Sequence, residues 1–140
     1  MSDRFFLDTN IFVYSFDRSA PGKREISDQL IRTAISSHKG VVSYQVVQEF
    51  FNVMFNRFAQ PLRQPDAELY LSNVLRPMLS IHSSAALFRQ AVYVHSEAKI
   101  SWYDSLIVSA AIQAECTTLF SEDLQHGQKI GSLTITNPFL

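Results

Sequence analysis

Short apolar runs alternate with longer stretches of helical periodicity along the chain. The runs at residues 4–8 and 40–42 are typical of strands buried in a parallel sheet, and residues 79–82, 117–120 and 133–136 are further strand candidates. Between them, apolar residues recur at the spacing of amphipathic helices. These expected helices follow Asn10 and cover residues 23–38, 43–58, 66–76, 84–98 and a segment that begins near Ser101. The alternation predicts an α/β fold with a mainly parallel central sheet flanked by helices.

The middle helices contain two features that the pattern leaves open. The segment "QPLRQP" (60–65) is expected to connect two helices, and Pro77 to end or kink the second of them. The apolar positions of residues 43–58 span about 200° at 100° per residue, which is wider than one core-facing stripe. Either the next helix covers the excess, or an exposed apolar patch remains, and such patches mark protein interfaces.

The composition is that of one globular domain over residues 1–140. Hydrophobic residues make up 46% of the chain and charged residues 18%, which suits a packed core. The net charge of −1 excludes a global basic field, so binding of nucleic acid would need local basic residues or metal ions. The single cysteine, Cys116, excludes an internal disulfide and is expected to be buried. Because no apolar segment approaches the length of a membrane span and no signal-peptide pattern is visible, we expect a cytoplasmic protein without membrane contact.

Acidic residues occupy places where the predicted strands end. Asp8 interrupts the apolar stretch "FFLDTNIFVY", and Glu122 and Asp123 follow the strand "TTLF" directly. Glu49 lies at the margin of an apolar helix stripe, and Asp104 lies in the first turn of an apolar helix. Ligands of open parallel sheets bind beyond the carboxyl ends of the strands. We therefore expect these carboxylates to gather at one edge of the sheet.

Each acid also has an ordinary structural interpretation. Asp8 can make a turn or cap the following helix, and Ser101-x-x-Asp104 resembles a capping box. Glu49 can be a solvated helix residue, and Glu122 and Asp123 can begin a turn before Gly127. Carboxylates that gather at one edge repel each other, however, unless a cation neutralises them, and hard oxygen ligands suit Mg²⁺ or Mn²⁺. The four histidines have no zinc-binding spacing and are interpreted as surface or packing residues.

Four motifs in a fixed order resemble those of PIN-domain nucleases, and within that family the VapC-type toxins of type II toxin–antitoxin systems. "FLDTNIFVY" is similar to the opening motif, and Glu49 matches the second acid, on the helix after the second strand. "YDSLIVSAA" is similar to the third motif, and "LFSEDLQHG" to the fourth, in which a Ser two residues before an Asp follows a strand. The spacing from Ser121 favours Asp123 over Glu122 as the fourth acid.

The resemblance implies an endoribonuclease that hydrolyses RNA phosphodiester bonds with Mg²⁺ or Mn²⁺. It also implies a homodimer and a small antitoxin partner. The catalytic and metal-binding residues that it implies are Asp8, Glu49, Asp104 and Asp123, with Asn10 and Ser121 orienting the carboxylates. The basic residues that can contact phosphates are Arg18, Lys23, Arg24, Arg57 and Arg63.

Other functions that place an Asp after the first strand are less consistent with the sequence. A phosphatase of the haloacid-dehalogenase type needs a second Asp where this chain has Asn10. The early acidic pair and central phosphoacceptor of a response-regulator receiver are missing, and the four glycines form no phosphate-binding loop. The alternative that stays open is a PIN-fold protein without nuclease activity that acts as a protein-interaction module. Such a module would have no reason to keep the acids together.

Overall fold

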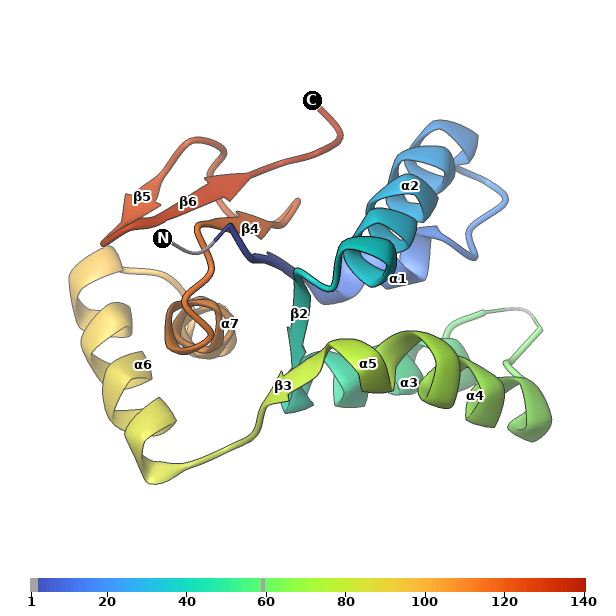
Figure 1. Ribbon diagram of the computed structural model, residues 1–140, viewed down its shortest axis with the longest axis horizontal. Coiled ribbons are helices and arrows are strands. Elements are labelled where there is room, and N and C mark those ends of the chain that lie inside the picture. Colours follow the sequence, from blue (N-terminus) through green and yellow to red (C-terminus); the bar gives the residue numbers. More distant parts are fainter. Residues whose placement is uncertain (1–2, 59) are drawn as a thin grey trace.

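A six-stranded sheet forms the centre of the molecule in the computed structural model, which describes residues 3–58 and 60–140. The strand order is β3-β2-β1-β4-β6-β5, and every neighbouring pair is parallel except β5 and β6 (Figure 1). The strands are β1 (Phe5–Leu7), β2 (Gly40–Ser43), β3 (Leu79–Ile81), β4 (Thr118–Phe120), β5 (Lys129–Ile130) and β6 (Leu133–Thr136). The predicted α/β fold with a mainly parallel sheet is confirmed.

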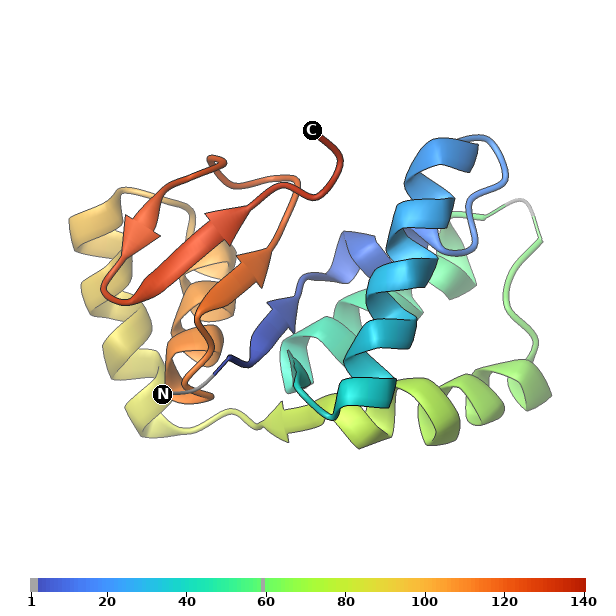
Figure 2. The same ribbon diagram turned by 45° about the horizontal axis from the view of Figure 1, so that its top comes forward.

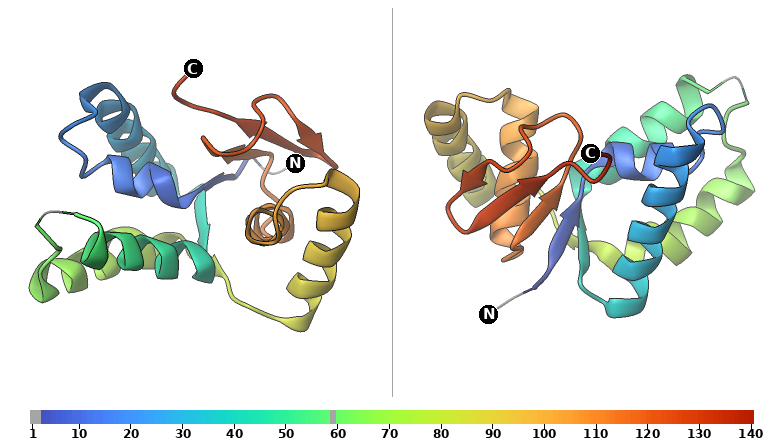
Figure 3. Two further views of the ribbon diagram at one scale, coloured as in Figure 1. Left: turned by 180° about the vertical axis from the view of Figure 1, so that it is seen from behind. Right: turned by 90° about the horizontal axis from the view of Figure 1, so that it is seen from above.

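Helices cover both faces of this sheet. They are α1 (Thr9–Tyr14), α2 (Pro21–Ser37), α3 (Tyr44–Asn56), α4 (Gln64–Tyr70), the π-helical turn η1 (Leu71–Leu75), α5 (Arg76–Met78), α6 (Ala85–Ala98) and α7 (Trp102–Gln113). Helix α2 lies on one face, and α6 and α7 lie together on the other (Figure 2). The views from behind and above show α3 and the α4–α5 segment beside β2 and β3, away from the β5–β6 edge (Figure 3).

The core consists of the central strands and the helix beneath them. Phe6, Leu7 and Val42 are fully buried, as expected for strands covered on both faces. Helix α7 is buried over most of its length because it lies between the sheet and α6. Cys116 is buried as predicted, and burial raises the pKa of its thiol to about 12. None of the helices in the described part of the chain has the length and apolar content needed to cross a membrane.

The structure differs from the predicted elements at two places. Of the two outcomes expected at Pro77, the end of the helix does not occur, because the chain continues from Gln64 through η1 and α5 to Met78, and the helix is instead irregular at η1. The wider π-helical turn ends at Leu75 and contains Asn73, the residue whose carbonyl the ring of Pro77 would clash with in a regular α-helix. The sequence pattern also missed β5, a two-residue strand that pairs with β6 through a turn in which Gly131 has a φ of +61°.

The wide apolar face of α3 is covered only in part. Phe50 is buried and stacks on Tyr70 at a ring-centroid distance of 5.0 Å, so the next helix covers one side of the face. Phe55 keeps 44% of its surface exposed, and Leu71 keeps 38%. A shallow apolar groove, called here the α3–α4 groove, remains between the two helices and is lined by Phe51, Phe55, Leu62, Ala67 and Leu71. Both outcomes that the sequence left open therefore occur.

Candidate active site

The sheet edge at which β1 and β4 end carries a pocket of about 290 Å³. Its lining includes the carboxylates of Asp8, Glu49, Asp104 and Asp123, which come from four separate segments of the chain. We call this hollow the acidic pocket. It also contains the side chains of Thr9, Asn10, Gln45, Asn52, Val53, Arg57, Tyr103 and Ile107. The right-hand twist and parallel order of the strands thus bring residues from the start and the end of the chain into one site.

Asp8 is the most buried of the four acids, and it caps α1 while it also lines the acidic pocket. It is the N-cap of α1, where one carboxylate oxygen accepts a hydrogen bond from the Thr9 N–H at 2.7 Å. The other oxygen accepts one from the Ser121 hydroxyl at 2.8 Å. Burial, helped by the charges of Glu49 and Asp123, raises the pKa of Asp8 to about 6 against the effect of these hydrogen bonds.

Glu49 faces the acidic pocket from α3 rather than the solvent. Its Oε1 accepts a hydrogen bond from the Thr9 hydroxyl at 2.7 Å, and its Oε2 accepts one from the Gln45 amide at 3.2 Å. Gln45 also donates to the backbone oxygen of Tyr103 at 3.2 Å. The side chains around Glu49 therefore fix both of its oxygens and connect α3 to the start of α7.

Asp104 has a different position from that of a capping-box acid. The Ser101 hydroxyl caps α7 by accepting a hydrogen bond from the Asp104 N–H at 3.1 Å. The Asp104 carboxylate lines the acidic pocket instead of returning to Ser101. Helix capping here depends on the backbone of Asp104, so the carboxylate is available for another purpose.

The adjacent acids after β4 point to different surroundings. Glu122 forms an ion pair with Lys23 at 2.9 Å and accepts a hydrogen bond from the Tyr14 hydroxyl at 3.1 Å, outside the acidic pocket. Asp123 lines the pocket and accepts a hydrogen bond from the Asn10 amide at 3.1 Å. Partial burial raises the pKa of Asp123, and the charges of Asp104, Glu122 and Glu49 add to this effect. The spacing argument from Ser121 thus agrees with the geometry.

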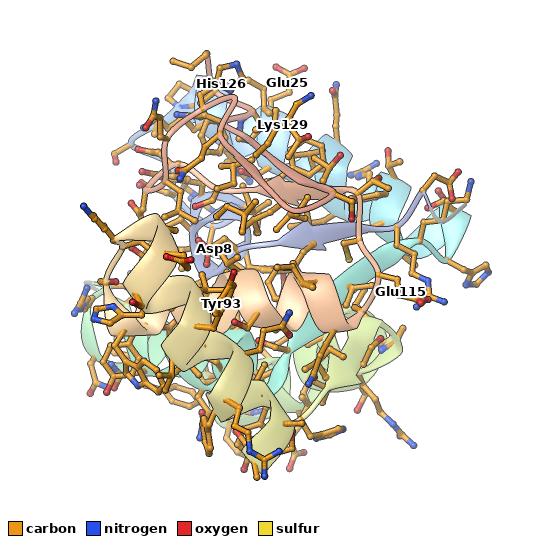
Figure 4. The ribbon with its side chains drawn as sticks, turned by 90° about the vertical axis from the view of Figure 1, so that its left-hand side faces the viewer. Asp8, Glu25, Tyr93, Glu115, His126 and Lys129 are labelled. Atoms are coloured by element: carbon orange, nitrogen blue, oxygen red, sulfur yellow. The ribbon has the colours of Figure 1, made fainter. Side chains whose placement is uncertain are left out.

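The donor set of the pocket fits a hard divalent cation held with water. Among the described residues, no group of three or more His, Cys, Asp and Glu side chains is close enough to enclose a metal ion. Mg²⁺ is usually bound through one or two carboxylates and keeps several waters, so an open pocket lined by four carboxylates suits it. His126 accepts a hydrogen bond from the Asn137 N–H and lies far from Asp8 at the rim of the molecule (Figure 4).

Several residues of the pocket were not found from the sequence. Gln45, Glu49, Val53 and Arg57 follow each other at four-residue spacing along α3 and its C-cap, a periodicity that could have revealed Gln45 and distinguished Arg57 from the other predicted basic residues. Thr9 follows Asp8 directly, but nothing in the sequence indicates that its hydroxyl reaches α3. That contact depends on how α1 packs against α3, which is a tertiary property.

The comparisons with known proteins agree with this geometry. The family model of the PIN domain matches residues 5–129, and the chain belongs to this family. It is similar in structure to a toxin–antitoxin complex from Klebsiella pneumoniae (17% identity, 95% of this chain and 96% of that chain, TM-score 0.64). It is also similar to VapBC2 from Rickettsia felis bound to a promoter DNA fragment (21% identity, 94% of this chain and 96% of that chain, TM-score 0.62). A third similar structure is VapC20 from Mycobacterium tuberculosis, described as a sarcin–ricin loop cleaving toxin (16% identity, 85% of this chain and 89% of that chain, TM-score 0.55).

These structures share the fold with the chain, and the predicted resemblance to PIN domains of the VapC type is confirmed. No curated protein sequence matches the chain. PIN nucleases generally use divalent metal ions, which is consistent with the donor set of the acidic pocket.

Proposed function

We propose that the chain is a metal-dependent endoribonuclease and the toxin of a toxin–antitoxin pair, acting in the cytoplasm. The observation that carries this proposal is the gathering of Asp8, Glu49, Asp104 and Asp123 around one pocket. A fold gains nothing from placing four repelling carboxylates together unless a cation or a substrate uses them. The membership in the PIN-domain family and the toxin–antitoxin neighbours support the same function.

In the proposed hydrolysis, some residues of the acidic pocket bind the cation and others orient those ligands. Asp8, Asp104 and Asp123 would hold Mg²⁺ or Mn²⁺, and Glu49 would act as a further ligand or orient the attacking water. When bound, the cation stabilises negative charge on the phosphate and promotes deprotonation of that water. Ser121, Thr9 and Asn10 donate hydrogen bonds to Asp8, Glu49 and Asp123 respectively, and these bonds keep the carboxylates in the orientation that a cation requires.

Arg57 is the basic residue that we assign to the RNA phosphate. It lines the acidic pocket from the end of α3, whereas Lys23 is paired with Glu122 outside the pocket. A guanidinium group binds phosphate oxygens through two parallel hydrogen bonds and also offsets the charge of the four acids. Its position at the mouth of the pocket suits a phosphodiester that approaches the carboxylates.

Cleavage of RNA with and without metal tests the proposal. In Mn²⁺ the purified chain is expected to cut RNA, and EDTA is expected to stop it. Asp8→Asn and Asp104→Asn should each abolish cleavage and remain folded. Asparagine is also a good N-cap for α1, and Ser101 still caps α7 through the backbone of residue 104. Asp28→Asn is the matched control, since Asp28 forms an exposed ion pair with Arg32. Cleavage that survives EDTA, or that persists undiminished in Asp8→Asn, would overturn the mechanism.

Calorimetry separates this proposal from a PIN-fold interaction module without nuclease activity. A nuclease is expected to bind Mn²⁺ in the wild-type protein and to lose that binding in Asp8→Asn. A chain that binds no Mn²⁺ and still associates with a protein partner would be the interaction module.

A small antitoxin is the partner that we propose for the intact cell. The similar structures from Klebsiella pneumoniae and Rickettsia felis are toxin–antitoxin assemblies. We expect the antitoxin to block the acidic pocket, so that co-expression restores growth to cells that the lone chain arrests. Harmless overproduction of the active chain on its own would count against the toxin role.

A further inference from the structure

A second hollow adjoins the acidic pocket, and nothing described so far uses it. It encloses about 100 Å³ and shares Gln45 and Tyr103 with the acidic pocket. Its walls are mainly rings and amides, contributed by Tyr44, His82, Phe88, Tyr103, Gln45 and Gln48. We call it the aromatic cleft.

The aromatic cleft lies between α3, α6, α7 and the end of β3, and two of these elements, α3 and α7, also line the acidic pocket. Tyr44 and the two glutamines belong to the first turns of α3, and Tyr103 precedes Asp104 on α7. His82 follows β3, and its ring lies 6.0 Å from that of Tyr44 between centroids. Tyr103 is 66% exposed and Tyr44 is 46% exposed, so neither ring is needed to fill the core. Large rings left exposed beside a hollow are typical of binding surfaces.

The polar groups of the cleft are arranged to contact a ligand edge. Ser43 is 3% exposed and lines the cleft, yet its hydroxyl has no hydrogen-bond partner among the described residues. Buried polar groups are nearly always satisfied, so a polar edge that enters the cleft would supply the partner that this hydroxyl lacks. The Gln45 amide, which bonds to Glu49 and to the backbone of Tyr103, separates the cleft from the carboxylates.

The charge of the cleft identifies the class of ligand. No Asp, Glu, Lys or Arg is among the residues that line it, although four carboxylates and Arg57 line the hollow next to it. A phosphate would find no Lys or Arg here, and a cation would find no carboxylate. A neutral planar ring can stack on exposed tyrosine rings and bond to amides and hydroxyls through its edge, as unpaired nucleobases do in RNA-binding proteins.

We propose that the aromatic cleft binds an unpaired nucleobase of the nucleotide next to the phosphate held in the acidic pocket. This inference rests on the proposed ribonuclease function and names the form of its substrate, an RNA segment that is single-stranded at the cleavage site. Tyr103 provides the stacking surface, because its side chain lines both hollows and connects the base to the scissile phosphate.

RNA binding is tested in the inactive Asp8→Asn background, with a single-stranded oligonucleotide and fluorescence anisotropy. Tyr103→Ala and Tyr44→Ala are each expected to weaken binding about fivefold to 100-fold, while Tyr103→Phe, which keeps the stacking ring, binds as well as the parent. An oligonucleotide that lacks the base at the cleavage site should bind weakly to the parent and be insensitive to Tyr103→Ala. In the active protein, Tyr103→Ala should raise KM more than it lowers kcat.

Tyr93→Ala is the matched control, because Tyr93 is 65% exposed on α6 and does not line the cleft (Figure 4). It is expected to leave RNA binding unchanged. If wild type cuts RNA but Tyr103→Ala binds the oligonucleotide as tightly as its parent, the proposed base-binding role of the cleft is wrong. The proposed ribonuclease function would then still stand. If Tyr103→Ala instead converts a dimer to a monomer, the cleft is part of the contact between two copies of the chain and not a base-binding site. A wild-type protein that neither cuts nor binds RNA would overturn both proposals.

Discussion

Asp8 is a buried carboxylate whose two hydrogen bonds compensate only part of the cost of burying its charge. Because burial raises its pKa to about 6, the metal-free folded protein binds a proton that the unfolded chain, with a pKa near 3.8, has released. Stability is therefore expected to fall as the pH rises from about 4 to about 6, and this one residue accounts for roughly 3 kcal/mol of the loss.

Urea denaturation in EDTA at several pH values measures this effect. The stability difference between wild type and Asp8→Asn should grow in favour of the variant across that pH range, and Asp28→Asn should follow the wild type. Mn²⁺ at pH 7 should restore stability to the wild type alone, since it binds only the folded site. Parallel pH curves for wild type and Asp8→Asn would contradict the expectation.

The adjacent acids Glu122 and Asp123 should respond differently to loss of charge. Glu122→Gln removes a partly exposed ion pair with Lys23, so we expect a small loss of stability and near-normal cleavage. Asp123→Asn removes a carboxylate from the acidic pocket, so cleavage should fall by more than about 100-fold with stability unchanged or raised. Cleavage rates and urea midpoints of the two variants check this, and an inactive, well-folded Glu122→Gln would reverse the assignment.

At the scale of elements, one close contact determines how α2 packs on the sheet. A Cβ added to Gly40 at the start of β2 would lie 2.2 Å from the Ala34 Cβ and 2.9 Å from the Ala34 Cα. Gly40→Ala is therefore expected to destabilise the fold by about 1–3 kcal/mol, because α2 must move away from β2.

Gly22→Ala is the control for this substitution, since nothing lies within 4 Å of a Cβ added there. Gly22 belongs to the first turn of α2, where alanine favours the helix, so its variant should be unchanged or more stable by up to about 1 kcal/mol. Thermal unfolding of both variants provides the comparison. Equal melting temperatures for the two would show that the sheet tolerates a wider spacing.

The order of elements could be predicted from the sequence because burial dictates apolar periodicity. Residues 40–42 form a continuous apolar run because β2 is covered on both sides, and α7 is apolar nearly all round for the same reason. Residues 133–136 alternate between buried apolar residues and partly exposed threonines, which is the period of a strand. The strand β5 could not be predicted, because two residues are too few to show an alternation of apolar and polar positions, and this strand exists only through its pairing with β6. The exposed part of α3 and the hydrogen bond from Thr9 to Glu49 depend on how helices pack, which no local pattern records.

For the whole molecule, the α3–α4 groove predicts association between copies. Phe55 and Leu71 remain exposed beside this groove, and an apolar surface of this kind is stabilised when a second chain covers it. We expect a dimeric mass by light scattering at micromolar concentration. Phe55→Ser should shift the mass toward the monomer, whereas Tyr93→Ala should leave it unchanged. A monomeric wild-type protein would contradict the homodimer.

The position of β1 in the sheet has a consequence for the synthesis of the protein. This strand is made first, yet it lies between β2 and β4, and Asp8 bonds to a serine 113 positions later in the chain. While the chain is still growing, one edge of β1 stays unpaired and the early carboxylates have no Asp123 beside them. Contacts so distant along the sequence form late in folding. A ribonuclease with this topology would be inert while still attached to the ribosome, and its own messenger would be spared until translation is nearly complete.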